Sequence, residues 1–126
     1  MTKHVPRILI VDDEMDTRLI VASVVELMGY EDYSQARDGK EALAMLRAKT
    51  YDLVISDWVM PKMTGLELLQ AMRGDRALKR IPFIMVTAED EARHVTQAAG
   101  AGADDMLLKP FVTKDLEERI SRILGR

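Results

Sequence analysis

Residues 7–14 read RILIVDDE, a short apolar run that leads directly into three acids. The run is apolar at consecutive positions rather than at alternate ones, which is typical of a strand buried on both faces of a parallel sheet. Open parallel sheets bind their ligands at the carboxyl ends of the strands. The sequence therefore predicts a central strand whose end carries candidate functional residues.

Four more short runs predict further strands, of which the first is the weakest: Asp32–Ala36, Leu53–Ser56, Phe83–Val86 and Met106–Leu108. Between the strands, apolar residues recur at helical spacing. They are Ile20, Val24, Leu27 and Met28, then Leu43 and Leu46, then Leu66, Leu69 and Met72, and finally Leu116, Ile120, Ile123 and Leu124. Alternating strands and helices indicate βαβ crossovers, and so an α/β fold with a doubly wound parallel sheet of (βα)₅ order.

The fourth predicted helix, Glu91–Gly100, differs from the others because Val95 is its only large apolar residue. Ala99 and two further alanines complete its apolar face. Such a helix buries little area against the sheet. Two interpretations stay open: small residues let the helix pack closely, or the helix is held loosely and can shift.

The composition fits one domain over residues 1–126, with no room for an output domain. The net charge of −3 argues against binding to nucleic acid, and no apolar run is long enough to cross a membrane. No secretion signal and no cysteine are present. We expect a cytoplasmic monomer that acts through a partner protein.

Polar residues follow four of the predicted strands: Asp12 and Asp13, then Asp57, then Thr87, and finally Lys109. Three ionised carboxylates in one cleft would repel one another, and a hard divalent cation such as Mg²⁺ relieves the repulsion. The ammonium group of Lys109 and the hydroxyl of Thr87 would favour binding of an anionic group beside Asp57. The set predicts phosphoryl transfer with a carboxylate nucleophile.

Two other families place acids at strand ends. A nucleotide hydrolase of the Walker type would also need the motif GxxxxGK[ST], which is absent here. A phosphatase of the haloacid dehalogenase type needs a second aspartate two residues after the nucleophile, whereas Asp57 is followed by Trp58 and Val59. Both interpretations are disfavoured.

Taken together, these residues make the whole chain resemble the receiver domains of bacterial response regulators. The matching motifs are Asp12-Asp13, Asp57, Met60-Pro61 with Gly65, Thr87-Ala88 and Lys109-Pro110-Phe111. Within this family the chain is similar to stand-alone chemotaxis regulators of the CheY type, which also share residues 65–69 and 85–89. The resemblance implies a flavodoxin-like fold with strand order 2-1-3-4-5.

The resemblance also implies residue roles. Asp57 would accept a phosphoryl group from a histidine kinase, a phosphotransfer protein or acetyl phosphate. Asp13, Asp57 and the backbone carbonyl of Val59 would bind Mg²⁺, and Asp12 would act largely through water. Thr87 and Lys109 would contact the phosphoryl group, and the Lys109-Pro110 bond would be cis.

Two residues depart from the chemotaxis branch. Met106 stands where those regulators carry a switching tyrosine, so it is either a packing residue or a different kind of switch. With Val95 and Ala99 it belongs to the expected partner surface of the fourth helix, fifth strand and fifth helix. Val59 replaces a polar residue that orients water, which predicts slow self-dephosphorylation.

The sequence thus predicts a response regulator of a two-component pathway that acts on an unidentified downstream protein. The resemblance implies that the pathway is a chemotactic one. It would not be an enzyme beyond its own phosphorylation and dephosphorylation. A phosphate sink or relay intermediate has the same chemistry and stays open. A Mg²⁺-dependent phosphatase is the remaining alternative, and it would need a substrate pocket.

Overall fold

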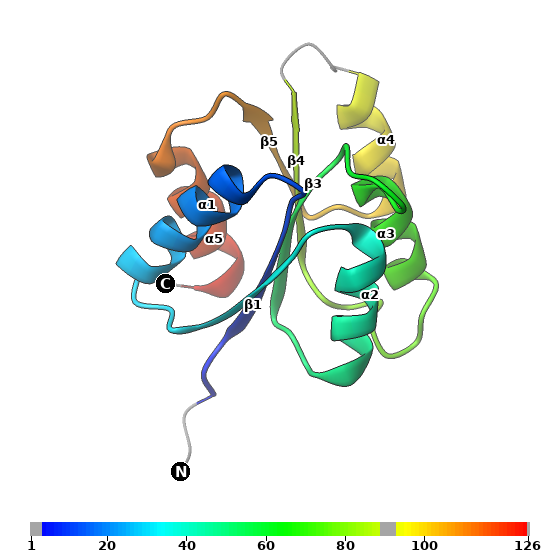
Figure 1. Cartoon of the computed structure of the whole chain (residues 1–126), viewed down its shortest axis with the longest axis horizontal. Helices are drawn as coiled ribbons and strands as arrows, with labels where there is room; N and C mark the ends of the chain where they lie inside the picture. The colour runs from blue at the N-terminus through cyan, green and yellow to red at the C-terminus, as the bar shows by residue number, and fades with distance from the viewer. Residues whose placement is uncertain (1–3, 89–92, 126) are drawn as a thin grey trace.

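The computed structural model describes residues 4–88 and 93–125, with the side chains of residues 93–95 outside the description. Within it, strands and helices alternate (Figure 1). Their bounds are β1 Arg7–Val11, α1 Met15–Leu27, β2 Asp32–Ala36, α2 Gly39–Ala48, β3 Leu53–Asp57, α3 Gly65–Arg73, β4 Phe83–Ala88, α4 Arg93–Ala101, β5 Asp105–Lys109 and α5 Thr113–Leu124. Every predicted strand is present, and the last three are one or two residues longer than predicted.

The strands form one parallel sheet in the order β2-β1-β3-β4-β5. This order confirms the predicted flavodoxin-like α/β fold. The connection from β1 runs to one side of the sheet, to β2, and the chain then returns to the other side, to β3. The carboxyl ends of β1 and β3 therefore flank the point where the winding reverses, which is where sheets of this kind bind ligands.

Helices cover both faces of the sheet, with α1 and α5 on one face and α2, α3 and α4 on the other (Figure 1). Successive residues of β1 alternate between the two cores: Ile8 and Ile10 pack toward α1 and α5, and Leu9 and Val11 pack toward the opposite helices. All four side chains are buried. Burial on both faces explains why the strand is apolar at consecutive positions.

The two cores differ in their methionine content. Six of the nine methionines belong to the core beneath α2, α3 and α4: Met60, Met72 and Met85 are buried, and Met45, Met63 and Met106 are partly buried against them. We call this core the methionine-rich face. Isoleucine, valine and leucine fill most of the opposite core. Methionine side chains are unbranched and flexible, so the two cores differ in how easily they repack.

The predicted apolar stripe of α1 is half right, because Val24 is buried and Met28 packs against the same core, as predicted. The helix buries Val21, Ala22, Val24 and Val25, whereas Ile20 and Leu27 are 50% and 82% exposed. Apolar residues surround much of this helix, so helical spacing alone fits more than one stripe. Gly29 directly follows the C-cap Met28 and has a φ of 92°, the left-handed conformation in which helices commonly end.

The fourth helix is anchored at its carboxyl end. Within its described side chains, Ala98 is the buried residue, as expected for a helix of small residues. Beyond that end, the guanidinium of Arg73 on α3 donates two hydrogen bonds to the Gly102 carbonyl, at 3.1 and 2.9 Å, and pairs with Asp104 at 3.1 Å. Any shift of α4 relative to α3 must therefore begin away from this end.

No helix in residues 4–88 or 93–125 is both long enough and apolar enough to span a membrane.

Candidate functional site

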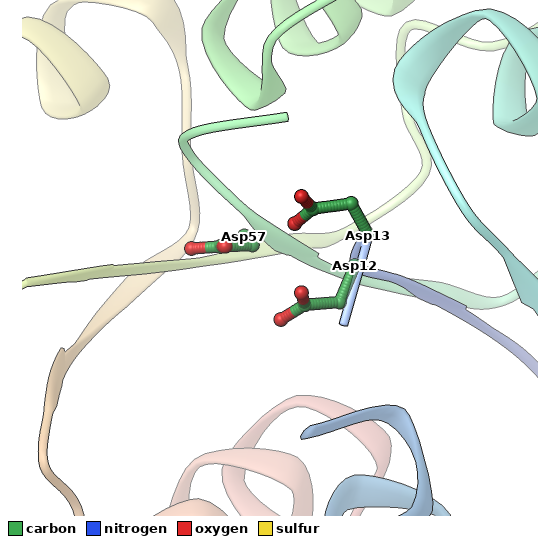
Figure 2. Close-up of side chains that lie close together, drawn as sticks. All are labelled: Asp12, Asp13 and Asp57. Carbon is green, nitrogen blue, oxygen red and sulfur yellow. The ribbon is translucent and has the colours of Figure 1, made fainter. Parts of the chain in front are cut away.

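Three acids meet at the carboxyl ends of β1 and β3. Val11 pairs with Ser56 across these strands, so the next residues, Asp12 and Asp57, lie side by side. Oxygen atoms from the carboxylates of Asp12, Asp13 and Asp57 all lie within 4.8 Å of one another. Figure 2 shows the three side chains extending from the strand ends in the same general direction. Asp12 and Asp57 are 3% and 8% exposed, whereas Asp13 is open to solvent.

Backbone donors orient the two buried carboxylates. The Trp58 N–H donates to Oδ1 of Asp57, and the Glu14 N–H donates to Oδ1 of Asp12, each at 2.9 Å. Lys109, the last residue of β5, approaches the other oxygens: its Nζ lies 3.3 Å from Oδ2 of Asp57 and 3.6 Å from Oδ2 of Asp12. The ammonium group thus joins the cluster that the sequence predicted.

Thr87 stands on β4 beside this cluster. Asp57 pairs with Val86, so Thr87 is one position beyond the partner of Asp57, and it is 1% exposed. Side chains alternate along a strand, which places Thr87 on the same face as Met85, toward α2, α3 and α4. Thr87 therefore lies at the same sheet edge as the acids, one residue beyond the strand partner of Asp57.

Burial is the main electrostatic feature of the site. It raises the pKa of Asp12 to about 6, opposed by the hydrogen bond from Glu14 and assisted by the charge of Asp57. Burial also raises the pKa of Asp57, although Lys109 opposes the change. Burial alone would lower the pKa of Lys109, but Asp57 and Asp12 outweigh it and the pKa is raised. The sequence had suggested mutual repulsion of the acids as the main electrostatic effect. Removal from water is instead the larger cause of the raised pKa of Asp12 and Asp57.

The donor set fits a hard divalent cation. Three carboxylates and one ammonium group leave two net negative charges in a site that is partly shielded from water. The exposed side of the cluster, at Asp13, leaves room for water ligands, and few carboxylates with several waters are typical of Mg²⁺ sites. Val59 lies in the loop after β3 with its side chain 64% exposed. Binding of Mg²⁺ by the backbone carbonyl of Val59 stays a prediction.

Comparison with known proteins gives the family. Residues 8–121 match the response regulator receiver domain. The chain belongs to this family. The receiver domain is 41% identical to chemotaxis protein CheY of Pseudomonas aeruginosa over 120 residues, which cover 95% of this chain and 97% of that protein.

Solved structures agree with this assignment. Chemotaxis response regulator CheY4 of Vibrio cholerae has a TM-score of 0.87 and 33% identity, over 95% of this chain and 99% of that one. The signal receiver domain of a histidine kinase from Syntrophus aciditrophicus has a TM-score of 0.88 and 33% identity, over 95% and 90%. The receiver fold and the similarity to chemotaxis proteins therefore rest on both sequence and structure.

Gly65 lets the loop after β3 pack closely against the site of this receiver domain. The Gly65 N–H donates to the Trp58 carbonyl at 2.8 Å, so the loop that leads into α3 lies against the end of β3. A Cβ atom at this position would stand 2.2 Å from the carbonyl oxygen of Asp57. Only glycine fits here without moving the backbone of the candidate nucleophile. The Lys109-Pro110 bond of the same site is cis, as predicted.

The predicted partner-surface residues are placed as follows. Ala99 is exposed on α4, and Met106 on β5 is partly buried against the methionine-rich face, opposite Met85 in the strand register. The side chain of Val95 lies outside the described residues. A packing role for Met106 agrees with these contacts, and switching by this surface stays a prediction.

Sequence reasoning missed Arg18 of the receiver domain. This half-buried residue of α1 donates from Nη1 to the backbone carbonyl of Asp12 at 2.7 Å. It also missed the backbone N–H donors of Glu14 and Trp58, because backbone groups leave no residue-type signal. A basic residue six positions after Asp12 was the available clue to Arg18.

We expect the raised pKa of Asp12 to appear as pH-dependent stability of the metal-free protein. The folded state holds this proton more tightly than the unfolded chain, so the contribution of Asp12 to the free energy of unfolding falls as the pH rises from about 4 to about 6. Asp12→Asn should therefore raise the free energy of unfolding near neutral pH by on the order of 1 kcal/mol, after allowance for screening by water.

Urea unfolding of both proteins in EDTA measures this difference. The gain should disappear at about pH 3, where the acid is protonated in both states of the wild type. Asp16→Asn, which removes an exposed acid from the first turn of α1, is the matched control for a simple change of net charge. Equal stability of Asp12→Asn and wild type at neutral pH would contradict the prediction.

Proposed function

We propose that the chain is a phosphorylation-controlled switch in which Asp57 accepts the phosphoryl group. The observation that carries the proposal is the contact between Nζ of Lys109 and Oδ2 of Asp57, at 3.3 Å, inside a cluster with two further acids. The carboxylate is thus held ready as a nucleophile, and a cation lies where the oxygens of an incoming phosphoryl group would need one.

The transfer step uses groups of this chain. A carboxylate oxygen of Asp57 attacks the phosphorus of the donor and forms a new O–P bond. The bond from phosphorus to the leaving group breaks, and the leaving group, acetate or the imidazole of a phosphohistidine, keeps the bonding electron pair. The Lys109 ammonium group pairs with the phosphoryl oxygens, and the Thr87 hydroxyl donates a hydrogen bond to them.

Asp13, Asp57 and the Val59 carbonyl would hold Mg²⁺, with Asp12 acting largely through water. When bound, the metal neutralises charge on the phosphoryl oxygens during transfer. The protein's share would be to supply these oxygen ligands and to fix the Asp57 carboxylate through the Trp58 backbone N–H. The donor atoms and the excess negative charge of the cluster support this assignment.

The switch differs from a phosphatase in its stoichiometry. Incubation with acetyl phosphate and Mg²⁺ should give one acid-stable, base-labile acyl phosphate per chain, measured by intact mass. Continuous release of inorganic phosphate from phosphomonoesters, at many turnovers per chain, would contradict the switch and support the phosphatase. A phosphate sink or relay intermediate would give the same acyl phosphate and would differ in lacking a downstream target.

A histidine kinase or a phosphotransfer protein is the proposed donor, because the relatives include chemotaxis response regulators and a receiver domain from a histidine kinase. The proposed output surface comprises α4, β5 and α5, which would contact a downstream protein after phosphorylation. A binding partner that is captured by the beryllofluoride-loaded protein, and not by the free protein, would support this surface. Substitution of exposed Ala99 by a bulky residue should then weaken the capture.

Val59 predicts a long-lived acyl phosphate. Its exposed isopropyl group stands two residues after Asp57 and cannot hydrogen-bond an attacking water. Val59→Asn supplies an amide that can, and we expect it to shorten the lifetime of the phosphorylated protein about tenfold. The decay of acyl phosphate after removal of the donor measures the lifetime.

Val59→Ala separates water orientation from simple shielding, because it removes bulk without adding a polar group. We expect its lifetime to stay close to that of the wild type. An unchanged or longer lifetime in Val59→Asn, or equal shortening in both variants, would refute the role assigned to Val59.

A further inference from the structure

Arg18 joins α1 to the backbone of the acidic pair. Its Nη1 donates to the Asp12 carbonyl at 2.7 Å, and its Nε donates to Oε1 of Gln35, on β2, at 3.1 Å. The side chain is half-buried. One guanidinium group therefore spans the first helix, the end of the first strand and the neighbouring strand, because arginine presents several donors in a fixed plane.

The hydrogen bond to Asp12 also constrains Asp13. The Asp12 carbonyl and the Asp13 N–H belong to one planar peptide group, so fixing the oxygen fixes the rotation of the whole group. The Asp12 N–H is already held by the Ala36 carbonyl at 3.1 Å, and Oδ1 of Asp12 is held by the Glu14 N–H at 2.9 Å. Arg18 thereby completes the restraint at the point from which the Asp13 side chain departs.

Asp13 depends on this restraint more than the other two acids do. Its side chain is exposed, and within residues 4–88 and 93–125 its carboxylate makes none of the hydrogen bonds or ion pairs that hold Asp12 and Asp57. Its place in the cluster, within 4.8 Å of both other acids, is consequently set by its backbone. The backbone at this point is what Arg18 contacts.

We propose that Arg18 is a positioning residue for the carboxylate cluster, one that aims Asp13 at the metal by anchoring the Asp12–Asp13 peptide. The inference rests on the proposed function, since it concerns the same site. Two opposite effects of Arg18 on a cation can be separated by their sign. Its positive charge repels the cation, so loss of the charge alone would tighten Mg²⁺ binding, whereas loss of the anchor would weaken it.

Titration with MgCl₂, followed by Trp58 fluorescence and by calorimetry, tests the proposal. Trp58 is the only tryptophan and directly follows Asp57, whose carboxylate accepts from the Trp58 backbone N–H, so we expect its emission to respond to binding at this site. We expect Arg18→Ala to raise the Kd for Mg²⁺ about tenfold, as for other residues that orient metal ligands. Arg18→Lys, which keeps the charge and can donate one hydrogen bond, should show an intermediate Kd.

Arg47→Ala is the matched control, because Arg47 is also an arginine on a helix with a partner of its own, the carboxylate of Asp75 at 3.9 Å. It lies near the end of α2 and should leave the Kd for Mg²⁺ unchanged. An unchanged or lower Kd in Arg18→Ala would overturn the positioning role. Urea unfolding without metal checks that each variant is folded. If Arg18→Ala does not fold, Arg18→Lys and Gln35→Ala take its place. A wild-type Kd for Mg²⁺ in both of these variants would then overturn the proposal.

Failure of this inference differs from failure of the proposed function. A wild-type protein that binds Mg²⁺ and forms the acyl phosphate, alongside Arg18→Ala with an unchanged Kd, refutes the role of Arg18 alone. A wild-type protein that binds no Mg²⁺ and forms no acyl phosphate refutes the proposed function and the positioning role with it.

Discussion

Asp57→Asn is expected to abolish formation of the acyl phosphate. An amide oxygen is far less nucleophilic than a carboxylate, and a phosphorylated amide cannot replace the acyl phosphate, a mixed anhydride, that the wild type would form. The substitution is nearly isosteric, so the Trp58 N–H, which contacts Oδ1 of Asp57 at 2.9 Å, keeps an acceptor. Intact-mass measurement after incubation with acetyl phosphate and Mg²⁺ should show no mass gain.

Asp16→Asn controls for the loss of one acid, because Asp16 is exposed on the first turn of α1. It should be phosphorylated to the same extent as the wild type. Phosphorylation of Asp57→Asn at the wild-type level would place the acceptor elsewhere and would refute the proposed function.

Lys109→Met is expected to slow phosphorylation by acetyl phosphate about a hundredfold, the scale seen when a charge-stabilising group is removed from a reacting site. Methionine has a similar length and no charge. The variant loses both ion pairs of Nζ, at 3.3 Å to Asp57 and 3.6 Å to Asp12, and leaves two buried acids without their cation. The nucleophile is then harder to ionise, and the incoming phosphoryl oxygens lose a partner.

The initial rate at saturating Mg²⁺ measures this effect, since saturation removes any change in metal affinity. Lys109→Arg keeps the charge in a broader, planar group and should recover part of the rate. A Lys109→Met rate within about twofold of the wild type would show that the lysine adds little to the transfer step.

The sheet and most of the site were predictable because the apolar runs mark strands buried on both faces. Parallel strands direct their carboxyl ends to one edge, so Asp12, Asp57, Thr87 and Lys109 could be placed together without coordinates. The register confirms this for Asp57, which pairs with Val86 next to Thr87. A residue at a strand end needs only the correct strand order to be placed correctly.

Features that depend on side-chain packing were not predictable in the same way. Half of the buried stripe of α1 was misplaced because apolar residues occupy several sides of this helix, and contact with the sheet selects Val21 and Val25 rather than Ile20 and Leu27. Arg18 was missed because its role depends on a backbone carbonyl, which every residue possesses. The main cause of the raised pKa of Asp12 is burial, whose extent only the folded chain reveals.

The methionine-rich face makes the two sides of the sheet spectroscopically unequal. Methyl groups of isotopically labelled methionine give sharp, separate resonances, and six of the nine lie beneath α2, α3 and α4. Met85 and Met106 pair across β4 and β5, so two of these probes stand on adjacent strands close to Thr87. Labelling methionine alone would therefore map how far a chemical change at Asp57 spreads through the core beneath α2, α3 and α4. The opposite core would contribute few signals to the same spectrum.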